Sequence, residues 1–205
     1  MKKIIGIAFF GSAWGFIEAT AGGAMHFANV PFTGTIMASL GFAILFAASK
    51  SSLKSGDLFA VSLLAASFKF LDAWLFSLPI MDRQILNPAT AIACQGLAAA
   101  ALMKFSEGGK NPARFFASLA SMAALSMIGF NLISYVGYGW ETNHTMNPLN
   151  SILIQFPATS ILSAAICTAY AAAALRVKNG LGLAWQAASA IALATSAVTI
   201  NLLMH

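Results

Sequence analysis

Three ionisable side chains interrupt the apolar stretches of this sequence: Glu18, Lys69 and Asp72. Charged groups among apolar residues are costly to bury, so they commonly pair with one another or bind an ion or a ligand. Lys69 and Asp72 are three residues apart, which lets them meet on one helix face. Glu18 follows Lys3 by 15 residues, and Asp72 follows Asp57 by 15 residues. At a helical rise of about 1.5 Å per residue, both carboxylates lie about 22 Å above these starting points, so we expect one shared layer.

Polar and aromatic residues elsewhere in the chain extend this candidate site. Uncharged amides are expected at a similar depth, and Trp74 lies near Asp72 in the sequence, where it can form a wall. The predicted ligand-binding residues are Glu18, Lys69, Asp72, Trp74, Asn87, Asn131 and Gln155. Each also has a structural interpretation, because Lys69 and Asp72 can form an internal ion pair and amides commonly bond neighbouring helices. Their shared depth is the reason to expect a site.

A metal site is a second interpretation of the same region. Glu18 and His26 offer oxygen and nitrogen ligands, and Asp72 adds a further carboxylate. Glu18 and His26 are eight residues apart, which places them about 80° apart around a straight helix. They converge only if the glycines in the segment 21–23 bend the helix. The sequence indicates no particular cofactor, and it contains no P-loop, G-x-S-x-G or H-E-x-x-H motif, so an enzyme is the less favoured class.

The composition decides the surroundings of these residues. Of the 205 residues, 59% are hydrophobic and only 8% are charged, against about 25% charged residues in a soluble domain. Seventeen charges cannot cover the surface of a soluble domain of this size, which excludes a soluble enzyme, a secreted disulfide scaffold and a disordered chain. The sequence pI of about 9.5 does not indicate nucleic-acid binding, because the basic residues are scattered between apolar runs. We therefore expect an integral membrane protein, with the lipid bilayer as its surroundings.

Seven apolar runs are long enough to cross a hydrocarbon core of about 30 Å as helices. They cover residues 4–26, 31–49, 58–80, 85–104, 113–138, 149–175 and 181–204. Alternating patterns typical of a β-barrel are not found, so the predicted fold is an all-α polytopic bundle of about seven transmembrane helices. The number is six if one of the first two runs, which have a short link, is re-entrant. The absence of repeats and linkers predicts a single transmembrane domain over residues 1–205.

The basic residues predict the orientation. If the N-terminus is cytoplasmic, nine of them lie on the cytoplasmic side and only Arg83 lies outside. The nine are Lys2, Lys3, Lys50, Lys54, Lys104, Lys110, Arg114, Arg176 and Lys178. This bias follows the positive-inside rule. It predicts a multi-pass protein of a bacterial-type cytoplasmic (inner) membrane, with the C-terminus outside.

A small polytopic chain with polar groups in the outer half of the membrane suggests transport, with a small-molecule or ion ligand. Its size, its alanine-rich helices and its lack of an ATPase motif resemble the substrate-binding components of energy-coupling-factor importers. The resemblance is one of architecture, without matching motifs, and those components have six spans where this sequence predicts seven. It implies a cytoplasmic ATPase module and other membrane subunits as partners. The alternatives are an accessory subunit of a respiratory or oxidase complex and, as a third class, a metal-binding membrane enzyme.

The predicted orientation can be tested by labelling single introduced cysteines in intact cells. Membrane-impermeant reagents should reach residues 140–147 from outside and should reach residues 105–111 only after the membrane is opened. The reverse pattern would overturn the predicted orientation.

Overall fold

The computed structural model describes residues 2–28, 30, 33–51, 53–75, 77–106, 112–138 and 157–165. All regular structure within these ranges is helical. In chain order the helices are α1 (Lys2–Ile17), a π-helical turn (Glu18–Gly22), α2 (Gly23–Phe27), α3 (Thr33–Lys50), α4 (Ser55–Leu75), α5 (Arg83–Ser106) and α6 (Pro112–Tyr138). A short helix over residues 157–165 follows.

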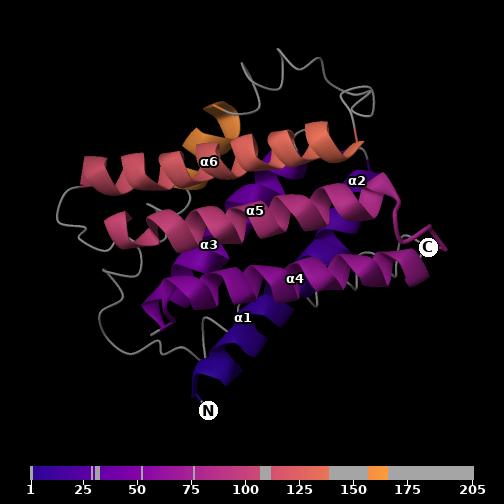
Figure 1. Ribbon diagram of the computed structural model, residues 1–205, viewed down its shortest axis with the longest axis horizontal. Coiled ribbons are helices and arrows are strands. Elements are labelled where there is room, and N and C mark those ends of the chain that lie inside the picture. The colour runs from indigo at the N-terminus through magenta and orange to yellow at the C-terminus, as the bar shows by residue number, and fades with distance from the viewer. Residues whose placement is uncertain are drawn as a thin grey trace.

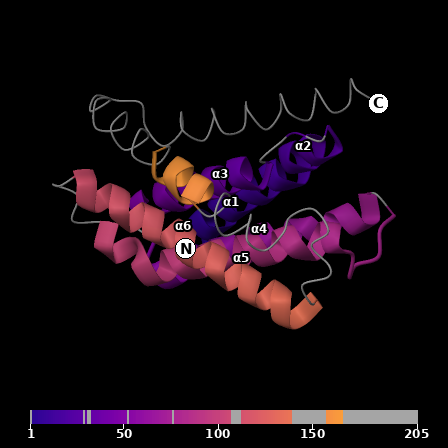
Figure 2. The same ribbon diagram turned by 90° about the horizontal axis from the view of Figure 1, so that it is seen from above.

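The helices form a bundle of two layers (Figures 1 and 2). α4, α5 and α6 follow one another as antiparallel neighbours in one layer, and α1 and α3 pack against it, α1 on α4 and α3 on α5. Four described segments are long and apolar enough to cross a membrane: Lys3–Met25, Thr33–Lys50, Arg83–Met103 and Ala113–Gly137. α4 has 21 residues, which gives a length of about 31 Å, and it lies between α1 and α5. The described chain is thus an all-helical bundle that is suited to a membrane.

Apolar side chains occupy both the inside and the outside of the bundle. Each long helix contributes a core side chain that is at most 1% exposed: Trp14, Phe42, Leu58, Ile92 and Leu119. The outer face of α6 is also apolar, with Ile128, Leu132 and Val136 each more than half exposed. A large exposed apolar surface is unfavourable in water but is expected for helices that face lipid.

The observed helices agree with four of the predicted spans to within two residues at each end. The prediction of a helix over 58–80 is wrong at its C-terminal end, because α4 stops at Leu75. Ser77 adopts a left-handed conformation with φ 52°, and the Leu78 N–H donates to the Ala73 carbonyl at 2.9 Å. This is the bonding of a Schellman C-cap, in which a left-handed residue ends the helix.

The last two predicted spans are described only in part or not at all. The span 149–175 is described over residues 157–165, and the span 181–204 lies outside the described residues. The total of seven spans therefore stays a prediction.

Glycines let α1 approach α4 closely. A Cβ atom at Gly11 would lie 2.8 Å from Leu64 Cδ2, and one at Gly15 would lie 2.5 Å from Phe68 Cγ. The residue numbers increase together along this contact, so α1 and α4 run parallel. A Gly-x-x-x-Gly pattern of this kind removes side chains from one helix face and permits close packing.

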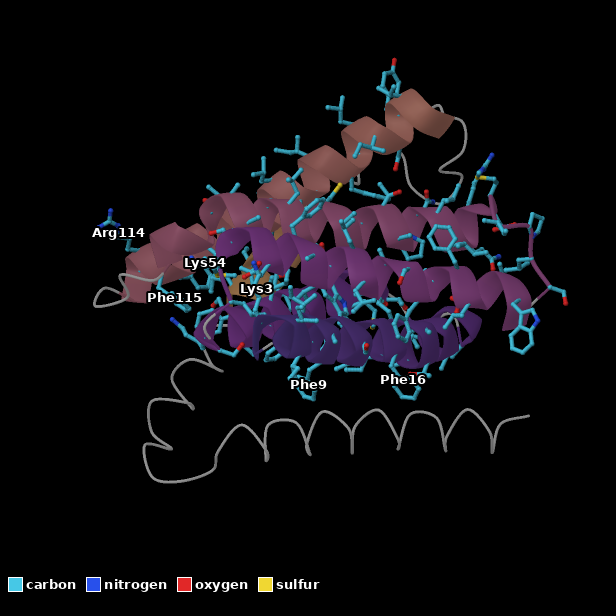
Figure 3. The ribbon with its side chains drawn as sticks, turned by 60° about the horizontal axis from the view of Figure 1, so that its bottom comes forward. Lys3, Phe9, Phe16, Lys54, Arg114 and Phe115 are labelled. Atoms are coloured by element: carbon cyan, nitrogen blue, oxygen red, sulfur yellow. The ribbon has the colours of Figure 1, made fainter. Side chains whose placement is uncertain are left out.

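Basic residues lie at one end of the bundle. Figure 3 shows Lys3, Lys54 and Arg114 at the same end, where α1, α4 and α6 begin. This is the grouping on which the predicted orientation depends, and the side of the membrane on which it lies stays a prediction.

An ion pair at this end aligns the starts of α1 and α4. Lys3 Nζ lies 2.7 Å from Asp57 Oδ1, and the Lys54 N–H donates to Asp57 Oδ2 at 3.0 Å. The hydrogen bond from the Lys3 ammonium, and then that from the Lys54 backbone, lower the pKa of Asp57 because both favour the ionised carboxylate. Lys3 and Asp57 thus lie at one level, as the count of 15 residues to Glu18 and to Asp72 requires.

The close contact of α1 with α4 predicts that Gly15→Ala destabilises the protein. The added methyl group overlaps Phe68, and overpacking of this kind costs about 1–3 kcal/mol. Thermal unfolding of the purified protein in detergent measures the effect. Gly56→Ala is the matched control, because a Cβ atom there meets nothing within 4 Å, and its unfolding midpoint should be unchanged or higher. Equal midpoints for the two variants would contradict the packing described.

The Lys3–Asp57 pair predicts a pH-dependent contribution to stability. The pKa of Asp57 is lower in the folded protein than its unfolded value of about 3.9, so the pair stabilises the fold above that value and is lost as the pH falls through the folded-state pKa. Asp57→Asn should lower the unfolding midpoint slightly at neutral pH, since Lys3 is mostly exposed. The difference from the wild type should disappear in acid, below about pH 3. A difference that persists unchanged in acid would contradict a role for the carboxylate.

Candidate functional site

Glu18, Lys69 and Asp72 are all buried, at 7%, 3% and 5% exposure respectively. We call these three residues the charged layer. Lys69 Nζ donates to Asp72 Oδ2 at 2.5 Å within α4, and Glu18 interacts electrostatically with both residues from α1. The parallel contact explains the meeting, because Gly15 lies against Phe68, and Glu18 and Asp72 lie about one turn beyond them.

Glu18 lies at the start of the π-helical turn that interrupts the first helix. A Cβ atom at Gly22 would lie 2.7 Å from Glu18 Oε2 and 3.5 Å from Met37 Cε of α3. The carboxylate therefore folds back toward Gly22, into space that only a glycine leaves open. Within the part of the chain that the structure describes, no side chain or backbone group donates a hydrogen bond to it. Single π-helical turns inside helices are frequent at functional sites.

The charged layer is not balanced. With Lys69 protonated and both carboxylates ionised, one negative charge is in surplus. Asp72 Oδ1 is also buried and has no hydrogen-bond partner among the described residues. A charge at the centre of a membrane helix costs roughly 2.5–3.5 kcal/mol on insertion scales, and an unpaired buried oxygen adds a desolvation cost of about 1–3 kcal/mol. The layer therefore offers negative charge and a free acceptor to whatever enters it.

The structure does not bring the other predicted residues into this layer. Trp74 is 82% exposed, because two residues along a helix turn it about 200° from Asp72, so it does not form a wall. Asn87 is half-buried near the start of α5, and Asn131 donates through Nδ2 to the carbonyl of Met127 on its own helix, at 2.8 Å. Gln155 lies outside the described residues.

The metal interpretation gains no support from the described residues. Among them, no three His, Cys, Asp or Glu side chains lie close enough together to hold a metal ion. The π-helical turn does lie between Glu18 and His26, at the glycines where a bend was expected. The backbone of His26 is in α2, but its side chain is outside what the structure describes.

Two hydroxyl pairs that the sequence reasoning missed join α3 to the helix 157–165. Thr35 Oγ1 lies 3.0 Å from Thr159 Oγ1, and Ser39 Oγ lies 3.1 Å from Ser163 Oγ. Ser39 donates its own proton to the Thr35 carbonyl at 2.8 Å, so Ser163 must donate to Ser39. The signal was a Thr-x-x-x-Ser spacing in both segments, which places two hydroxyls on one face of each helix. These groups satisfy one another and serve helix packing.

A second missed feature lies about one turn from Glu18 toward the N-terminus of α1. Trp14 Nε1 and Gln95 Oε1 are buried and have no partner among the described residues. Both side chains contact Gly41 of α3, where a Cβ atom would lie 2.4 Å from Gln95 Oε1 and 2.5 Å from Trp14 Cζ2. Unlike the hydroxyl pairs, this donor and this acceptor are both unsatisfied. Neither had been assigned to the site, because no pattern in one sequence shows which helices face each other.

The described site thus combines a negatively charged layer with an unpaired donor and acceptor one turn away. Such groups suit the binding of a cation or of a polar solute with a positive charge. In comparisons of sequence and of fold, the chain matches no family model, no curated protein and no solved structure.

Proposed function

We propose that this protein is a membrane transport protein, a small solute-binding or uptake subunit with its polar site in the outer half of the membrane. The observation that carries the proposal is the charged layer of Glu18, Lys69 and Asp72, which is buried between helices and keeps a surplus charge and an unpaired acceptor. Ionisable residues inside membrane helices commonly mark the path of a substrate or ion.

The unpaired groups of Trp14 and Gln95 support a path rather than a single site. They lie about 6 Å from the level of Glu18, toward the end of the bundle at which α1 begins. A solute that leaves the charged layer in that direction meets a donor and an acceptor that the protein does not use itself. Polar groups at successive depths lower the cost of moving a polar solute through an apolar bundle.

The proposal includes a membrane setting. The chain would cross a bacterial-type cytoplasmic (inner) membrane about seven times, with the basic end of the bundle in the cytoplasm. Because the sequence has no P-loop, energy must come from an ion gradient or from a separate ATPase subunit. The architecture that the chain shares with energy-coupling-factor substrate-binding components favours partner membrane subunits and a cytoplasmic ATPase module.

An accessory subunit of a larger membrane complex is the alternative, and one observation favours it. The Lys69–Asp72 pair closes within one helix, and a pair of this kind can serve folding alone. In that case the charged layer would hold helices together and would bind no solute.

Native mass spectrometry of the protein released from membranes tests the proposal. We expect a small bound solute in the wild type and at least a tenfold lower bound fraction in Glu18→Gln and in Asp72→Asn. The reason is that each substitution removes a charged hydrogen-bonding group, worth about 1.5–3 kcal/mol.

The control for these variants is Asp82→Asn, the same chemical change outside the layer. Asp82 Oδ1 accepts a hydrogen bond from the Gln84 N–H at the start of α5, and asparagine can replace it as a cap. This variant should keep the wild-type bound fraction. A wild type without solute, together with loss of folding in both layer variants, would overturn the proposal in favour of the accessory subunit.

A further inference from the structure

We propose that the charged layer binds one exchangeable monovalent cation, either a proton or an alkali-metal ion, and that Glu18 is the group that receives it. This inference rests on the proposed function, because it names the class of ion that the same site takes. It concerns an ion that accompanies or replaces the solute, and it can be tested on the purified protein alone.

The number of charges indicates a monovalent ion. Two buried carboxylates face one buried ammonium, so a single added positive charge makes the layer neutral. A divalent ion would leave the layer with a positive surplus next to Lys69. In a medium of low dielectric constant either surplus is costly, and neutrality is the favoured state.

The pairing within the layer identifies the residue that lacks compensation. Lys69 donates to Asp72 Oδ2 on the same helix, so the charge of Asp72 is compensated by a direct contact. The carboxylate of Glu18 receives no such bond from the described residues. Glu18 Oε2, held beside Gly22, and the unpaired Asp72 Oδ1 are the hard oxygen ligands that a proton or an alkali-metal ion prefers.

The elements around Glu18 offer no other charge. α4 presents Lys69 and Asp72 to it, α3 presents the thioether side chain of Met37, and its own helix presents Gly22. Within the described residues, therefore, occupancy of Glu18 depends on Lys69, Asp72 and the ions in solution. Lys69 repels an incoming cation, which keeps binding weak enough for exchange.

Carbodiimide labelling tests the inference. Dicyclohexylcarbodiimide reacts with protonated carboxyl groups in apolar surroundings, and an alkali-metal ion bound to the same carboxylate prevents the reaction. The purified full-length protein is treated in choline chloride between about pH 5 and pH 9, with and without sodium, lithium or potassium chloride. Mass spectrometry then measures the labelled fraction of the peptide that contains Glu18.

We expect labelling of Glu18 to fall at least about tenfold as the pH rises across this range. Protection by sodium, lithium or potassium identifies an alkali-metal ion as the partner, and pH dependence without protection identifies the proton. Absence of labelling at every pH, or labelling that neither pH nor salt changes, overturns the inference, because a permanently protonated structural carboxyl would not exchange.

A variant gives an independent check. Asp72→Asn leaves Glu18 and Lys69 as a neutral pair, so the labelling of Glu18 should be lost, whereas Asp82→Asn should label like the wild type. If Asp72→Asn does not fold, the wild-type series in pH and salt still decides. No solute is measured in this experiment, so exchange at Glu18 in a protein that retains no solute would overturn the proposed uptake function and leave this inference standing.

Discussion

The parallel contact of α1 with α4 is the constraint on which the rest of the site depends. Two glycines on α1 remove the side chains that would keep the helices apart, and an ion pair between Lys3 and Asp57 joins their first turns. Because both helices rise about 1.5 Å per residue, equal counts from this pair lead to equal depths. Glu18 therefore meets Asp72 without any direct bond between them, and a shift of one turn would leave Glu18 against apolar side chains.

The depth of the charged layer could be predicted from the sequence because depth follows from counting residues along straight helices. The helix ranges could also be predicted, since long apolar runs identify membrane helices. The face of each helix could not, and Trp74 shows why: it is two residues from Asp72 but points away from it. The end of α4 was missed for a local reason, because the left-handed conformation of Ser77 is uncommon for a residue other than glycine.

Contacts between helices that are distant in sequence were the other unpredictable part. The hydroxyl pairs of α3 and the helix 157–165 join residues 124 positions apart. The meeting of Trp14 with Gln95 at Gly41 involves three helices. Each depends on which helix packs beside which, and a single sequence with uniformly apolar helices contains little information about that choice.

The satisfied and unsatisfied polar groups of the described bundle have different locations, and the difference bears on function. Hydroxyls between α3 and the helix 157–165 satisfy each other, as expected of groups that hold helices together. Apart from two serine hydroxyls of α6, the buried unpaired groups are Trp14 Nε1, Asp72 Oδ1 and Gln95 Oε1, at two neighbouring levels around α1. A folded chain gains nothing from leaving these unpaired. Their position beside a carboxylate without a donor is explained most simply if the missing partners come from outside the chain.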